Sequence, residues 1–116
     1  MRIVSVSENL NIEKRVAITP EIAKKYISNG FEVSLSEKYG EHLGFKDNDY
    51  KELGVKISKD EKEIIVSGDI IIQLGLPSDN KLSFLKENQT LVGILNPYIN
   101  KEKIDSLIKK KLITFL

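Results

Sequence analysis

Near the middle of the chain stands Asp69-Ile70-Ile71-Ile72-Gln73-Leu74, a short stretch with three consecutive isoleucines. A strand that faced water on one side would alternate apolar and polar residues, because successive side chains point to opposite faces. A run of branched apolar residues is instead typical of a strand buried on both faces, as in a parallel sheet with helices on either side. The stretch therefore predicts a central parallel strand.

Outward from this stretch, short apolar runs alternate with segments of helical period along the whole chain. The sequence predicts strands over 3–6, 31–35, 55–57, 69–74, 90–95 and 112–116, with helical segments between them. Such alternation is typical of an α/β fold with right-handed crossovers. We expect an open, mostly parallel sheet with helices on both faces, of the Rossmann or flavodoxin-like kind.

Helix boundaries have their own signals. Thr19-Pro20 predicts a helix start, with threonine as the N-cap and proline where its missing N–H costs nothing. Ser58, followed three residues later by Glu61, has the spacing of a capping box. Ser78 and Asn100 are the predicted caps of two later helices.

Length, charge and composition narrow the class of protein. The 116 residues suit one domain, 1–116, and 18 basic against 17 acidic residues leave a net charge of +1. Basic and acidic residues are interleaved, so no basic face for nucleic acid is expected. The absence of cysteine excludes disulfides and thiolate metal sites. No apolar run is long enough for a membrane span, and we expect a soluble, cytoplasmic chain. Because 113–116 is an uncovered apolar strand, we expect the domain to lead a longer protein.

Ligands of open parallel sheets bind beyond the carboxyl ends of the strands. The segments expected there are 7–19, 37–45, 75–77 and 96–99. A dinucleotide site needs glycines directly after the first strand, where the backbone approaches the pyrophosphate. Residues 7–15 contain no glycine. The domain is therefore expected to lack its own glycine-rich dinucleotide turn.

Arg15 is the most informative polar residue of the first of these segments. Its guanidinium suits a carboxylate or phosphate ligand, and it equally suits an internal ion pair with Glu8 or Glu13. The residues alone leave both alternatives open. His42 is the single histidine and, without cysteines, excludes an all-histidine or zinc-type metal site. We interpret it as a solvated loop residue and expect no metal.

The order of several segments resembles a known family. Glu13-Lys14-Arg15-Val16-Ala17-Ile18-Thr19-Pro20, Gly30-Phe31-Glu32-Val33, Gly44-Phe45-Lys46-Asp47-Asn48-Asp49-Tyr50 and the segment from Asp69 to Pro77 are similar to the amino-terminal domain shared by alanine dehydrogenase and the nicotinamide nucleotide transhydrogenase alpha subunit. The resemblance covers essentially the whole chain. Saccharopine dehydrogenases share a version of the Arg-Val-Ala-x-Thr-Pro segment.

The resemblance implies a set of site residues. Arg15 matches the substrate-binding arginine of the family, whereas the lysine and the catalytic histidine of alanine dehydrogenases are replaced by Gly75 and Asn96. Transhydrogenase alpha subunits carry an aromatic residue at the position of Asn96. The resemblance is therefore closer to the transhydrogenase alpha subunit, and Arg15, Gly75 and Asn96 are expected to line one wall of an interdomain cleft.

The same resemblance implies the partners and cofactors. The full-length enzyme would transfer hydride between NAD(H) and NADP(H), with NAD(H) bound mainly by a second domain of the subunit and NADP(H) by a partner. It would work as a homodimer, peripheral to the inner membrane and docked to its membrane components, while this domain alone would be inactive. The alternatives are an alanine or saccharopine dehydrogenase domain, and a stand-alone α/β module that binds an anion through Arg15.

Overall fold

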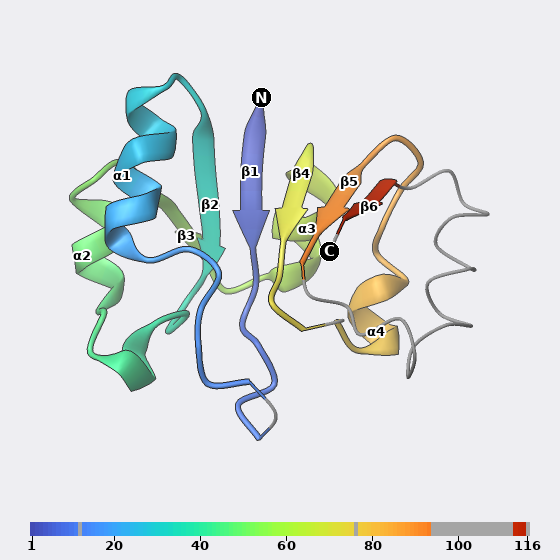
Figure 1. The fold of residues 1–116 in the computed structure, drawn as a ribbon, viewed down its shortest axis with the longest axis horizontal. Coiled ribbons are helices and arrows are strands. Elements are labelled where there is room, and N and C mark those ends of the chain that lie inside the picture. Colours follow the sequence, from blue (N-terminus) through green and yellow to red (C-terminus); the bar gives the residue numbers. More distant parts are fainter. Residues whose placement is uncertain (12, 76, 94–112, 116) are drawn as a thin grey trace.

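The computed structural model describes residues 1–11, 13–75, 77–93 and 113–115, which form one parallel sheet with helices around it (Figure 1). The sheet has six strands in the order β3-β2-β1-β4-β5-β6, and every neighbouring pair is parallel. The strands are β1 (Arg2–Ser5), β2 (Glu32–Ser36), β3 (Lys56–Ser58), β4 (Ile70–Ile72), β5 (Thr90–Val92) and β6 (Ile113–Phe115). The helices are α1 (Pro20–Ser28), the 3-10 turn η1 (Glu41–Leu43), α2 (Asp47–Lys51), α3 (Glu61–Ser67) and α4 (Asp79–Leu82).

The strand order reverses direction at β1. The chain first builds outward from β1 to β2 and β3, and then returns to add β4, β5 and β6 on the other side. Val4 of β1 pairs with Ser34 of β2 and with Ile71 of β4, so β1 and β4 lie at the centre. The gap beyond the carboxyl ends of β1 and β4 is the topological switch point, where doubly wound folds bind ligands.

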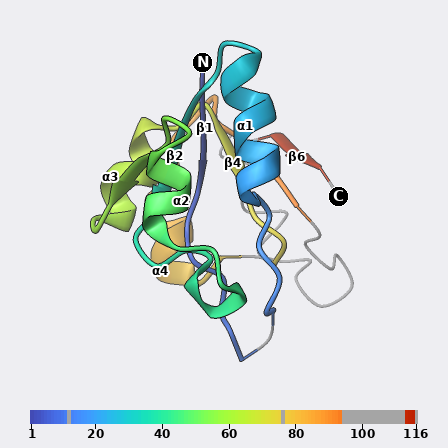
Figure 2. The ribbon, with the colours of Figure 1, turned by 90° about the vertical axis from the view of Figure 1, so that its left-hand side faces the viewer.

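Helices cover both faces of the sheet, which confirms the predicted architecture. Figure 2 shows α1 and α3 on opposite sides of β1. The pleat of β1 serves both faces, because Ile3 belongs to the core under α1 and α2, whereas Val4 belongs to the core under α3 and α4. Ile71 of β4 is likewise buried with Val4, while Ile70 and Ile72 pack against the other core. The three isoleucines are therefore consecutive because both faces of β4 are covered.

Local caps explain where most helices begin. The Thr19 side chain accepts from the N–H of Ile22, and the Ser78 side chain accepts from the N–H of Lys81, so both predicted caps are confirmed. The capping box predicted at Ser58 is wrong. Asp60 is the N-cap of α3 and accepts from Glu63 N, while Ser58 is the last residue of β3. The helix predicted after Asn100 lies outside the described residues.

Candidate functional site at the carboxyl edge

The site predicted from the sequence lies where the loops leave the carboxyl ends of β1, β2 and β4 (Figure 1). Arg15 belongs to the long loop from β1 to α1, and Gly75 follows β4. Asn96 lies outside the described residues. Arg15 and Gly75 have no direct contact in the described part of the chain, but both loops are tied to the same network of polar side chains.

Arg15 forms an internal ion pair with Glu13. Its Nε donates to Glu13 Oε1 at 2.8 Å, its Nη2 donates to Oε2 at 3.0 Å, and its backbone N–H also donates to Oε1. These hydrogen bonds lower the pKa of Glu13 to about 2 and raise that of Arg15. Of the two acids considered, Glu13 is the one that pairs. The Arg15 side chain is nevertheless 70% exposed, and an incoming anion can reach it.

Two buried tyrosines hold the segment that follows Arg15. The Tyr39 hydroxyl accepts from the N–H groups of Ala17 and Ile18, at 3.1 and 3.2 Å, and the Tyr50 hydroxyl donates to the Ile18 carbonyl at 2.8 Å. The two rings meet edge to face, with centroids 6.1 Å apart. Burial raises the pKa of Tyr39 to about 12 and also raises that of Tyr50. Both hydroxyls are therefore neutral hydrogen-bonding groups that fix the backbone of 17–18.

His42 secures the same loop from outside. Its exposed ring places Nε2 2.6 Å from the carbonyl oxygen of Lys14. A carbonyl only accepts, so Nε2 carries the proton in this contact. The histidine therefore acts as a tether for the residue next to Arg15, which agrees with its interpretation as a loop residue at the surface.

The Tyr39 hydroxyl also connects the loop to the centre of the sheet. It lies 2.8 Å from Ser5 Oγ, and Ser5 Oγ in turn lies 2.5 Å from the Ile72 carbonyl and 3.0 Å from Gln73 Oε1. Because Tyr39 already accepts two N–H groups, it donates to Ser5, and Ser5 donates to an acceptor of the β4 segment. A continuous chain of hydrogen bonds thus runs from 17–18 through β1 to the end of β4.

Gly75 faces a carboxylate. Glu8 Oε1 accepts from Gly75 N at 3.1 Å, and Glu8 Oε2 accepts from Leu74 N at 2.9 Å and from Gln73 Nε2 at 2.8 Å. Burial raises the pKa of Glu8, against the opposing effect of the two backbone hydrogen bonds. Sequence reasoning considered Glu8 only as a partner for Arg15. Its actual partners lie more than sixty residues away along the chain, and no local pattern indicates them.

Lys81, which the sequence had not singled out, adds a cation to this edge. Its Nζ donates to the Ser7 carbonyl at 2.9 Å and lies 3.2 Å from Glu61 Oε2. The side chain is partly buried, and its charge opposes the rise in the pKa of Glu8. The only sequence signal was its position in the first turn of a helix capped by Ser78, close behind the loop that follows β4.

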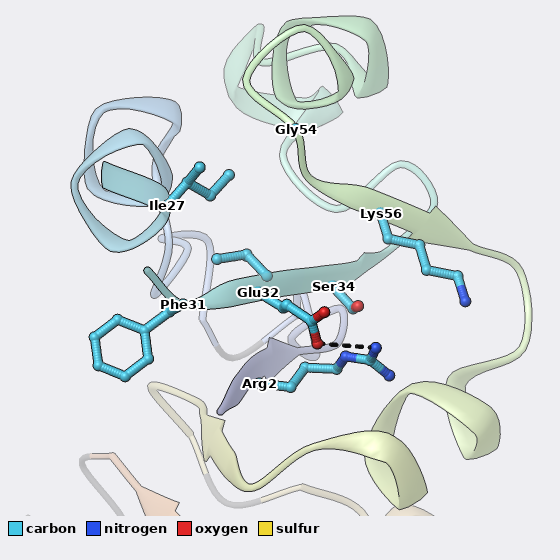
Figure 3. Close-up of a pocket in the computed structure, with 8 residues that line it drawn as sticks. Arg2, Ile27, Phe31, Glu32, Ser34, Gly54 and Lys56 are labelled. Carbon is cyan, nitrogen blue, oxygen red and sulfur yellow. Dashed lines mark hydrogen bonds and ion pairs between the residues drawn. The ribbon is translucent and has the colours of Figure 1, made fainter. Parts of the chain in front are cut away.

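A separate cavity of about 250 Å³ opens at the opposite, amino-terminal edge of the sheet (Figure 3). Arg2, Glu32 and Lys56, which open β1, β2 and β3, line it together with Ile27 and Gly54. Arg2 pairs there with Glu32 at 3.1 Å. None of the predicted site residues belongs to this cavity, and in open parallel sheets the chemistry lies at the carboxyl edge. The cavity therefore does not relocate the candidate site.

Two further kinds of site find no support among the described residues. No group of three or more His, Asp or Glu side chains there is placed to hold a metal ion. Within the same residues, none of the helices has the length and apolar character needed to cross a membrane.

A family model for the "Alanine dehydrogenase/PNT, N-terminal domain" matches residues 5–115. The chain belongs to this family. The resemblance inferred from the Arg-Val-Ala-Ile-Thr-Pro segment is thereby confirmed. Because its relatives are transhydrogenases and dehydrogenases, the family is one of oxidoreductases.

Three family relatives place the chain more closely. It is 40% identical over 120 residues to an NAD(P) transhydrogenase subunit alpha of Rickettsia prowazekii, the first of the pieces that make up that subunit, covering 99% of this chain and 31% of that protein. It is 29% identical to the alanine dehydrogenase of Halomonas elongata, over 83% of this chain and 26% of that protein. The crystal structure of transhydrogenase from Sinorhizobium meliloti superimposes with a TM-score of 0.87 at 27% identity, over 97% of this chain and 33% of that chain. The chain thus spans about a third of the length of these relatives.

Proposed function

We propose that this chain is the N-terminal domain of the alpha subunit of a proton-translocating NAD(P) transhydrogenase, which transfers hydride between NAD(H) and NADP(H). The identity of 40% over nearly the whole chain to a transhydrogenase alpha subunit exceeds the 29% to an alanine dehydrogenase. Gly75 supports the same choice, since it stands where alanine dehydrogenases need a lysine. Without that cation, the carboxylate of an amino or keto acid has one partner fewer at this edge.

In this proposal the domain forms one wall of the cleft and leaves the nucleotide phosphates to its neighbour. The observation that carries it is the Glu8 carboxylate, which fills the end of β1 and takes up the N–H groups of Leu74 and Gly75. In a dinucleotide-binding turn such N–H groups would face the pyrophosphate. A carboxylate in that place repels a phosphate, so NAD(H) is assigned mainly to a second domain of the same subunit.

Arg15, Gly75 and Asn96 are the proposed wall residues. Arg15 would exchange its ion pair with Glu13 for an anionic group of the bound nucleotide, at little cost because the pair is exposed. The further partners are the membrane and NADP(H)-binding components, with the subunit dimeric and peripheral to the inner membrane on its cytoplasmic side.

Calorimetry with NADH tests this division of labour. The intact alpha subunit that contains this domain should bind NADH, whereas residues 1–116 alone should show no micromolar binding, with circular dichroism as the check that the domain is folded. Tight binding by residues 1–116 would refute the assignment to a second domain. Turnover of alanine or saccharopine by the intact protein would instead favour one of the amino-acid dehydrogenases.

A further inference from the structure

The side chain of Gln73 extends the sheet past the last paired residues of β1 and β4. The backbone pairing of these strands ends with Val4 and Ile71. Beyond it, Gln73 Oε1 accepts from Val6 N at 2.7 Å, and Gln73 Nε2 donates to the Val6 carbonyl at 3.0 Å. The primary amide thus bonds to both backbone groups of one residue, as a paired strand would. Gln73 is 2% exposed, so these hydrogen bonds are protected from water.

Glu8 completes this extension at the outer end. One carboxylate oxygen accepts from both Gln73 Nε2 and Leu74 N, and the other accepts from Gly75 N. Three donors therefore converge on one ionised group, which only an unprotonated carboxylate can satisfy. The contact fixes the direction in which the chain leaves β4, and with it the position of Gly75.

We propose that Glu8 is the positioning residue of the β4 wall of the nucleotide cleft, and that it acts through the backbone N–H groups of Leu74 and Gly75. This inference rests on the proposed function, because it concerns the reaction that takes place in that cleft. Glu8 itself touches no substrate. It holds Gly75 so that a residue without a side chain faces the nucleotide at a fixed distance.

Protonation of Glu8 removes this support. A protonated carboxyl presents a donor to three donors, so at least one of the hydrogen bonds is lost. The charged and titratable groups that act on Glu8 are Glu13 of its own loop, Lys81 of α4 and Tyr39. Burial places the pKa of Glu8 above its ordinary value, so the support is lost at a higher pH than for an exposed glutamate.

The test uses the intact alpha subunit with Glu8→Gln, and Glu41→Gln as the matched control. Glu41 is an exposed acid at the same sheet edge, so its substitution changes the charge equally. Glu8→Gln keeps the side-chain size but turns an NH₂ group toward the donors. We expect the KM for NADH to rise about tenfold with kcat little changed, as for the loss of one hydrogen bond to a charged group. Glu41→Gln should behave like the wild type.

Two further readouts separate positioning from folding. In the wild type, the KM for NADH should rise as the pH falls through the titration of Glu8, whereas in Glu8→Gln it should already be high and flat over the same range. Hydrogen exchange of the Leu74 and Gly75 amides should be faster in Glu8→Gln, with unchanged exchange in β1.

The possible failures are distinguishable. A wild-type subunit without hydride transfer between NADH and an NADP analogue overturns the proposed function. An active Glu8→Gln subunit with the KM and pH profile of the wild type overturns the role of Glu8, whatever its amide exchange. Equal loss in Glu41→Gln also overturns it, because the effect would then be one of surface charge.

Discussion

At the scale of single residues, the Tyr39 hydroxyl carries more than its share of the loop's order. It is 1% exposed and is the acceptor for the N–H groups of Ala17 and Ile18, both next to the segment of Arg15. Tyr39→Phe leaves these two donors without a partner. A buried donor left unpaired costs about 1–3 kcal/mol, so we expect a loss of this size in the free energy of unfolding, measured by urea denaturation at neutral pH. Tyr26→Phe is the matched control, because the Tyr26 hydroxyl forms no hydrogen bond within the described residues.

The same substitution alters the response to alkali. Burial raises the pKa of Tyr39 from 10.0 to about 12, so between these values the folded state keeps a proton that the unfolded chain releases. Stability then falls as the pH rises through this window. Tyr39→Phe lacks this proton, and its free energy of unfolding should decline less steeply than that of the wild type over the same range. Equal slopes would show that Tyr39 ionises as freely in the fold as in the unfolded chain.

Residue types that suit a site could be recognised from the sequence, but their pairings could not. Arg15 was singled out because a guanidinium in a loop at the carboxyl edge has few uses. Which acid it meets depends on the path of the loop, and the structure gives Glu13 rather than Glu8. The contact between Glu8 and Gly75 closes 67 residues of chain. Such a contact exists only once β1 and β4 are neighbours in the sheet.

At the scale of elements, the strands and most helix starts were predictable because their signals are local. The N-caps Thr19 and Ser78 each act within three or four residues. Ser58 fits the same pattern but its backbone is already used by the sheet, where its carbonyl accepts from Glu37 N and it pairs with Ser36. Two residues later, Asp60 is free of β3 and caps α3 instead. Tertiary pairing thus overrode a correct local signature.

The packing of α3 on β1 depends on Gly68. A Cβ built there would lie 2.5 Å from Cγ2 of Val4, a buried and branched side chain that cannot move away cheaply. Gly68→Ala should therefore lower the free energy of unfolding by about 1–3 kcal/mol, as for other overpacked sites. Gly75→Ala is the matched control, because a Cβ there would lie 3.5 Å from Glu8 Oε1, an ordinary contact. Urea denaturation of both variants measures the difference, and equal stabilities would contradict the close approach of α3 to β1.

At the scale of the whole molecule, the carboxyl edge of the sheet differs from the rest of the surface. Leu10 and Leu43 are 44% and 45% exposed, and both lie on loops beside the tethered segment of Arg15. Of the described residues, the only other large apolar side chain as open to water is Met1, at the opposite edge. Apolar side chains exposed beside a candidate site are typical of a surface that another domain covers. The occupant that the proposed function supplies is the second domain of the same subunit.

Hydrogen exchange on residues 1–116 alone and on the intact alpha subunit tests this arrangement. Docking of a second domain excludes water from the carboxyl edge, so amides near Leu10 and Leu43 should exchange more slowly in the intact subunit. Amides beside the cavity at the amino edge, near Ile27 and Gly54, serve as the internal control and should exchange at the same rate in both. Slower exchange at the amino edge instead would place the partner over the 250 Å³ cavity. The interdomain cleft would then lie on the wrong side of the sheet for Arg15 and Gly75 to line it.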